Sequence, residues 1–170
     1  IIIENCRLLY GGGLVYQFRN DNDKGLIISN CYVKNTFDVT ALGNESIIEN
    51  TTFETSDSNY YDRPATEHAL YIHADRSHVT IRNCTFKNIR NTAVKISGTS
   101  LPIRDTKVLD CYFDDCGAAF IYGADDVAET NRHDYLILRG NTFRNCATNR
   151  TGWNEERAVW ILGASSVEID

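Results

Sequence analysis

Residues 78–97 read HVTIRNCTFKNIRNTAVKIS. Apolar residues alternate with other residues in three short runs, and alternating side chains lie on opposite faces of a β-strand. Asn83 interrupts the first alternation, and asparagine tolerates the left-handed backbone of a sharp bend. The stretch therefore predicts three short strands with a bend at Asn83. The side chains expected to face a core are those of Val79, Ile81, Cys84, Phe86, Val94 and Ile96.

The pattern apolar, any residue, Asn, small, any residue, apolar recurs along the chain. It appears as IENCRL (3–8), ISNCYV (28–33), IENTTF (48–53), IRNCTF (81–86), VLDCYF (108–113) and LRGNTF (138–143). The spacing between copies varies from 20 to 33 residues, which excludes a helical-hairpin array with its nearly fixed unit. Strands of constant length joined by loops of variable length explain this spacing. We therefore predict an all-β parallel solenoid of about six irregular turns with an asparagine ladder at the bend.

This pattern resembles the right-handed parallel β-helix of the pectin lyase-like superfamily, in which an asparagine bend joins the second and third strands of each turn. The resemblance covers essentially the whole chain, and within the superfamily it is greatest to the β-helices of phage tailspikes and tail appendages. Because the same scaffold carries lyases, hydrolases, epimerases and inert shafts, the resemblance implies a fold and leaves the activity open.

Composition bounds the class of protein. The chain has 170 residues, 42% of them hydrophobic and 24% charged, with a formal net charge of −6. One domain over residues 1–170 is expected, and an acidic chain without a basic run is a poor partner for nucleic acid. No apolar run approaches the roughly 18 residues that cross a bilayer, so membrane insertion is not expected. Apparent strands at both ends predict a segment of a longer helix, uncapped at each end.

The six cysteines follow the repeat. Four share one inward position, and two share another: Cys6, Cys31, Cys84 and Cys111 in the first set, and Cys116 and Cys146 in the second. Side chains stacked in register point the same way, which favours free buried thiols over disulfides. No Cys-x-x-Cys spacing occurs, so no metal site is predicted. Free thiols fit assembly in a reducing cytoplasm.

Four similar stretches, beginning at Ala69, Ala93, Ala118 and Ala158, place one residue between two inward positions. That residue is expected to face outward. One exterior column would hold Val15, Asp38, Tyr71, Lys95, Phe120 and Trp160, and a second would hold Gln17, Thr40, His73, Ser97, Tyr122 and Leu162. Long insertions flank the same sheet, at residues 54–68 and 144–157 on one edge and at residues 98–106 and 123–134 on the other. The sequence therefore predicts a groove, and in the enzymes that it resembles the substrate groove lies on this strand.

Aromatic rings pack against the C–H faces of sugars, and polar rims satisfy their hydroxyls, so an extended polysaccharide is the expected ligand. The expected substrate-binding residues are Tyr71, Phe120, Tyr122, Trp153, Trp160 and Arg157. A subunit contact is the alternative, because exposed aromatics also mark interfaces.

Two kinds of cleavage remain open. Hydrolysis needs two carboxyl groups, which would come from Asp125, Asp126, Glu155, Glu156 or Glu67. Elimination needs a base, from Lys95 with His73 and Tyr122, and a cation, from Arg76 or Arg157. The residues chosen as catalytic candidates are His73, Lys95, Asp125 and Glu155. No cofactor is expected; a calcium ion between Asp125 and Asp126 has only weak support.

We therefore expect a virion or extracellular protein of the tailspike type that forms a homotrimer. It is expected to bind a cell-surface polysaccharide, and degradation of that polysaccharide is a further hypothesis. A free-standing polysaccharide lyase or glycoside hydrolase is one alternative. A structural trimeric shaft without activity is the other.

Overall fold

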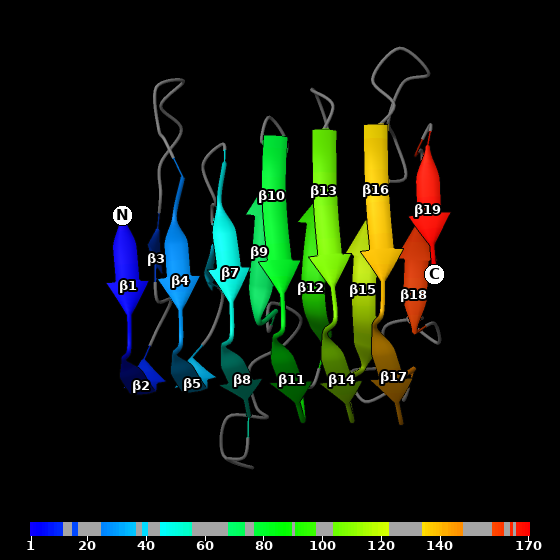
Figure 1. The fold of residues 1–170 in the computed structure, drawn as a ribbon. Coiled ribbons are helices and arrows are strands. Elements are labelled where there is room, and N and C mark those ends of the chain that lie inside the picture. The colour runs from blue at the N-terminus through cyan, green and yellow to red at the C-terminus, as the bar shows by residue number, and fades with distance from the viewer. Residues whose placement is uncertain are drawn as a thin grey trace.

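The computed structural model describes residues 1–11, 15–16, 25–36, 39–40, 45–55, 68–73, 77–89, 91–97, 104–122, 134–147, 158–161, 164 and 166–170. All regular elements in these ranges are strands, and they form three parallel sheets. The described residues contain no helix, and hence none long and apolar enough to cross a membrane. The predicted all-β parallel solenoid is confirmed (Figure 1).

Each coil of the chain contributes one strand to each sheet in turn. The first sheet has seven strands: β1 (Ile2–Glu4), β4 (Ile27–Ser29), β7 (Ile47–Glu49), β10 (Ser77–Arg82), β13 (Arg104–Leu109), β16 (Asp134–Arg139) and β19 (Val167–Ile169). The second has six: β2 (Arg7–Gly11), β5 (Tyr32–Thr36), β8 (Thr52–Glu54), β11 (Thr85–Lys87), β14 (Tyr112–Asp114) and β17 (Thr142–Arg144). The third also has six: β3 (Val15–Tyr16), β6 (Val39–Thr40), β9 (Leu70–His73), β12 (Thr92–Ser97), β15 (Ala118–Tyr122) and β18 (Val159–Ile161).

The core fills the space between the sheets. All six side chains that residues 78–97 were expected to turn inward are buried. Phenylalanines of the second sheet stack from coil to coil, with ring centroids 5.1 Å apart for Phe53–Phe86, 4.9 Å for Phe86–Phe113 and 5.1 Å for Phe113–Phe143. This apolar ladder removes large aromatic surfaces from water and therefore provides much of the stability of the fold.

The first corner, between the first and second sheets, is the predicted bend. Its residues all have positive φ, between 48° and 64°: Asn5, Asn30, Asn50, Asn83, Asp110 and Gly140. Their backbone N–H groups donate to carbonyls of the next coil; Asn83 N, for example, is 3.0 Å from Leu109 O. Asn and Gly adopt this conformation at low cost, which explains their recurrence.

The cysteine position next to this corner has a hydrogen-bonding role. The Cys31, Cys84 and Cys111 thiols each lie 3.2–3.3 Å from the carbonyl two residues earlier. Thr51 fills the same position in another coil: its hydroxyl donates to Glu49 O at 2.8 Å and accepts from Cys31 N at 3.2 Å. All six cysteines are free, and the predicted inward position of Cys31, Cys84, Cys111 and Cys116 is confirmed.

Two further corners have left-handed residues that the sequence reading did not predict. The second corner, after the second sheet, has positive φ at Asn35, Asn88, Asp115 and Asn145. The third corner, where the chain enters the first sheet, has positive φ at Glu45, His78, Asp105 and Tyr135. The residue types at the third corner are the unusual ones, because only one of the four is Asn, Asp or Gly.

Candidate functional site

The outer side of the third sheet was the predicted ligand surface, and its register decides which side chains lie there. Lys95 pairs with Tyr71 on one side and with Ile121 on the other, and Ile121 pairs with Trp160. The residues flanking Lys95, Val94 and Ile96, are fully buried. We call this column, made of Tyr71, Lys95, Ile121 and the backbone position of Trp160, the third-sheet face. The Ile121 side chain is only 5% exposed, so the described side chains of this face that reach solvent are those of Tyr71 and Lys95.

The prediction that Phe120 and Tyr122 face outward is wrong. Phe120 pairs with Val94 and Tyr122 with Ile96, and both aromatic side chains are 0% exposed. Two adjacent alanines allow two alignments of this stretch, and the structure aligns Ala119, rather than Ala118, with Ala93. A shift of one residue moves every side chain of a strand to the opposite face. These two rings therefore belong to the core, where their centroids lie 6.2 Å apart.

The start of the predicted column is also corrected. Val15 pairs with Val39, and Val39 pairs with the buried Leu70. Thr40, which was predicted for the neighbouring column, is the residue that pairs with Tyr71. Thr40 thus takes the register position that was predicted for Asp38, and Asp38 lies outside the described residues.

Tyr71 and Lys95 form the best-defined contact of this face. The Lys95 Nζ atom lies 5.9 Å from the centroid of the Tyr71 ring, within the range of a cation–π interaction. The Tyr71 ring also stacks with the imidazole of His68, at 5.3 Å between centroids and 19° between planes. Both Tyr71 and Lys95 are half-buried, so each retains surface for a ligand.

His68 stays neutral in this arrangement. Burial, and then the positive charge of Lys95, lower the pKa of its imidazole to about 3. A neutral ring can stack against Tyr71 without repelling the nearby ammonium group. Sequence reasoning assigned His68 only to the end of a long insertion; its spacing of three from Tyr71, just before the strand, was the one available signal.

Most predicted polar site residues are not placed. Asp125, Glu155, Trp153 and Arg157 lie outside the described residues, as do the further candidates Glu67, Arg76, Asp126 and Glu156. His73 ends β9 with its backbone beside Ser97, and its side chain is not among those described. Within the described ranges no group of three His, Cys, Asp or Glu residues could hold a metal ion.

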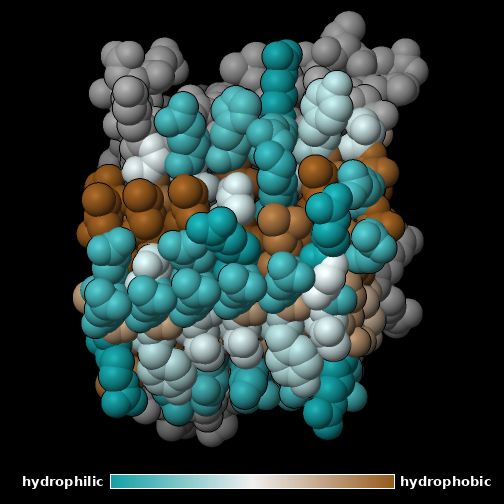
Figure 2. All heavy atoms as spheres, viewed as in Figure 1, coloured by the Kyte–Doolittle hydropathy of each residue, from teal (hydrophilic) through white to brown (hydrophobic). Residues whose placement is uncertain are grey.

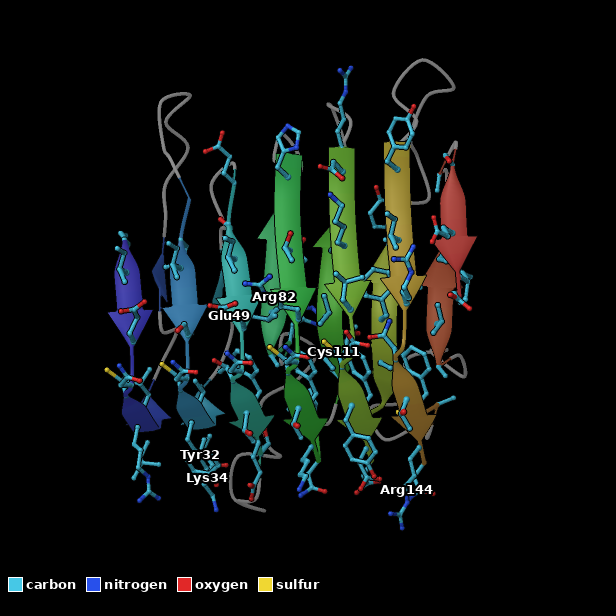
Figure 3. The ribbon with its side chains drawn as sticks, viewed as in Figure 1. Tyr32, Lys34, Glu49, Arg82, Cys111 and Arg144 are labelled. Atoms are coloured by element: carbon cyan, nitrogen blue, oxygen red, sulfur yellow. The ribbon has the colours of Figure 1, made fainter. Side chains whose placement is uncertain are left out.

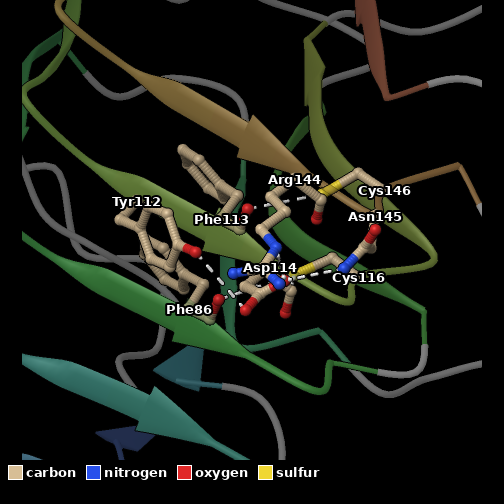
Figure 4. A network of polar contacts seen from close by, with 8 residues as sticks. All are labelled: Phe86, Tyr112, Phe113, Asp114, Cys116, Arg144, Asn145 and Cys146. Carbon is tan, nitrogen blue, oxygen red and sulfur yellow. Dashed lines mark hydrogen bonds and ion pairs between the residues drawn. The ribbon is translucent and has the colours of Figure 1, made fainter.

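Polar clusters also cover the other two sheets. On the first sheet Arg82 Nε donates to Glu49 Oε2 at 2.7 Å, and Figure 3 shows the two side chains pointing toward one another. On the second sheet Asp114 accepts from Asn145 Nδ2 at 3.3 Å and from Tyr112 Oη at 3.4 Å, beside Arg144 (Figure 4). Apart from the bond between Tyr112 and Asp114, which lies within β14, these contacts join neighbouring coils at the surface, where solvent screens them.

The third-sheet face offers an aromatic ring and an ammonium group along one line parallel to the solenoid axis. Its strands β9, β12, β15 and β18 contain no Asp or Glu, so the described strands supply no pair of carboxyl groups for acid–base cleavage. The arrangement suits binding of a ring-shaped ligand that carries hydroxyl or anionic groups.

Comparison with known proteins agrees with this geometry. Residues 1–143 match the family model described as the right handed beta helix region. No curated protein and no solved structure matches the chain. The matched region holds most strands of all three sheets and the whole of the first corner. The chain belongs to the right-handed β-helix family.

Proposed function

We propose that the third-sheet face binds an extended polysaccharide. The observation that carries the proposal is the contact between Lys95 and Tyr71 on neighbouring coils, with His68 stacked beneath the aromatic ring. A sugar packs its C–H face on an aromatic ring, and a lysine beside the ring adds a donor for hydroxyl or carboxylate oxygens. Membership of the β-helix family supports a carbohydrate ligand, because β-helix domains commonly bind or act on carbohydrates.

The shape of the face favours a long chain over a single sugar. Coils repeat about every 4.8 Å along the axis, so the column from Tyr71 to the Trp160 position extends across four strands. A polysaccharide that lies along the axis would contact Tyr71 and Lys95 on neighbouring coils, whereas the Ile121 side chain of the next coil is buried. Weak contacts on successive coils then add up along one chain.

We propose first that the protein binds the polysaccharide, and second that it cleaves the bound chain. Hydrolysis would draw its carboxyl groups from the flanking segments, where Asp125 and Glu155 remain the candidates, and elimination would use Lys95 as the base. Incubation with bacterial capsules and uronate polymers separates these cases. New reducing ends without ultraviolet absorbance indicate hydrolysis, and both together indicate elimination.

We further propose that the protein acts in a tailspike-like virion assembly as a homotrimer. The acidic composition and free thiols support this setting, and three copies would strengthen a weak grip on a surface polysaccharide. Light scattering coupled to size exclusion tests the assembly. A trimeric mass is expected, and a monomer that turns over substrate would instead favour a free-standing enzyme.

The test of binding uses variants of the third-sheet face and one control. Tyr71→Leu removes the aromatic ring but keeps apolar bulk over His68, and Lys95→Gln removes the charge but keeps the length. Each is expected to weaken binding to the capsule and uronate panel by about fivefold to tenfold, measured by calorimetry. Lys34→Gln is the matched control, because Lys34 lies on the outer side of the second sheet beside Glu54. Equal affinity of all four proteins would overturn the proposal.

A further inference from the structure

The third corner differs from the other two in its residue types. At the first corner, and at the second apart from Ala147 (φ 69°) just beyond Asn145, left-handed backbone is carried by Asn, Asp and Gly, which tolerate it. At the third corner Glu45 and Tyr135, with φ of 63° and 55°, adopt the same conformation, which is costly for these residue types, whereas His78, with φ of 61°, adopts it more readily. Asparagine would make the same bend at lower cost. The side chains at this corner therefore have a role other than forming the bend, which asparagine would form as well.

These side chains lie in one row on neighbouring coils. Val79 pairs with Thr106 and Thr106 with Leu136, so His78, Asp105 and Tyr135 occupy equivalent positions. Glu45 occupies the same position one coil earlier, two residues before Ile47, which pairs with Thr80. Adjacent coils are about 4.8 Å apart, so His78 and Tyr135 are separated by roughly 10 Å of surface above Asp105.

His78 and Asp105 form an oriented pair. Nδ1 of His78 lies 2.8 Å from Oδ2 of Asp105, and Nζ of Lys107 lies 2.9 Å from Oδ1 of the same carboxylate. The hydrogen bond from His78 and then the one from Lys107 lower the pKa of Asp105, so the carboxylate is ionised and accepts from Nδ1–H. In the tautomer that donates from Nδ1, the imidazole keeps the lone pair of Nε2 as an acceptor, on a side chain that is 62% exposed.

We propose that the third corner is a second ligand site, which binds a sugar residue of a neutral glycan between His78 and Tyr135. Tyr135 is 65% exposed and offers its ring face to the sugar C–H groups. Nε2 of His78 accepts from a sugar hydroxyl, and the position of Asp105 fixes the direction of that hydrogen bond. One or two pyranose rings span the distance between the two side chains.

Charge at this corner favours a neutral ligand. The acids Glu45, Asp105 and Asp134 outnumber the bases Arg104 and Lys107 by one, and this excess of negative charge disfavours an anionic ligand. Figure 2 shows hydrophilic side chains over the upper ends of β10 and β13, beyond the apolar row over β1, β4 and β7. The third corner belongs to the first sheet, whereas Tyr71 and Lys95 belong to the third, so this inference does not depend on the proposed function.

The experiment follows the His78 and Tyr135 ring signals by NMR while the isotope-labelled protein is titrated with neutral hexasaccharides of glucose, mannose, galactose and xylose. His78→Asn and Tyr135→Asn are the test variants, because asparagine keeps the left-handed bend and each fold should remain as stable or become more so. Each is expected to weaken binding about tenfold. Asp115→Asn at the second corner is the matched control and should bind as the parent protein does.

The outcomes separate this site from the third-sheet face. Loss of neutral-glycan binding in both asparagine variants, with binding retained in Lys95→Gln, supports the assignment. Ring signals that none of the hexasaccharides shifts would overturn it, and so would binding that survives both asparagine substitutions. In either of these cases the corner is a bend or a protein contact.

Discussion

The rings of Phe86 and Phe113 stack at 4.9 Å between centroids and 7° between planes, each contributed by a neighbouring coil. Phe53 and Phe143 continue the stack at either end. Because identical side chains in register repeat the same packing, each ring contacts two others except at the ends. The second sheet is therefore bound to the core through one continuous aromatic ladder.

Removing one ring from the middle of this ladder should leave a cavity bounded by two rings. Phe113→Ala is expected to lower the free energy of unfolding by about 3–5 kcal/mol, since the neighbouring rings cannot close the gap. Urea unfolding followed by circular dichroism measures the change. Phe143→Ala is the control: that ring is 38% exposed and has one stacking partner, so its loss should cost clearly less. Equal losses would show that stacking does not carry the stability.

Thr51 replaces the cysteine found at the same position in other coils, and its hydroxyl satisfies two backbone groups. Thr51→Val keeps the shape but leaves Cys31 N–H and Glu49 O without that partner. The expected loss is about 1–3 kcal/mol of unfolding free energy. Thr51→Cys should lose less, because a thiol here can donate to the carbonyl two residues earlier, as in Cys31 and Cys84. Equal stability of the parent protein and the valine variant would refute this role of the hydroxyl.

The inward positions and the first corner could be predicted from sequence because their signals are local. Alternation of apolar residues sets which side of a strand is buried, and Asn83 marks a bend that few other residues make cheaply. Each of these features needs only a few neighbouring residues. The fold follows once the same local pattern is repeated along the chain.

The register of the third sheet could not be predicted in the same way. Ala118 and Ala119 both fit the small position of the repeat, and only pairing with β12 and β18 decides between them. The third corner was missed for a different reason: Glu45 and Tyr135 have low preference for left-handed backbone, so nothing local marks them. Both the third-sheet face and the third corner could therefore be located only from the pairing of strands between coils.

The thiols should differ in reactivity according to burial. A hydrogen bond from Cys116 lowers the pKa of Cys146 to about 7, and the same hydrogen bond, followed by burial, raises the pKa of Cys116. Because thiolates are the nucleophiles, iodoacetamide at neutral pH should label Cys146 well before Cys116. Peptide mapping by mass spectrometry follows the order of labelling. Cys116→Ser is the companion variant, and similar rates for both cysteines in the parent protein would contradict the prediction.

Asp105 should make the fold sensitive to acid. The hydrogen bonds from His78 and Lys107 lower its pKa in the folded state below the value of about 3.9 in the unfolded chain. A carboxyl group with a depressed folded pKa adds stability above the unfolded pKa, and this stability is lost as the pH falls through the folded pKa.

The contribution of Asp105 is expected to be under about 1 kcal/mol, because the side chain is about a third exposed and solvent screens the contacts. The Asp105→Asn variant isolates the contribution of the charge to stability, since asparagine keeps the left-handed backbone and removes the charge. Urea unfolding should show the variant less stable than the parent at pH 6, with the difference shrinking toward pH 2 as the parent's carboxylate is protonated. Added salt should shrink the difference at pH 6 as well, because exposed ion pairs are screened. A gap between the two proteins that stays constant from pH 6 to pH 2 would mean that the charge of Asp105 adds nothing to folding.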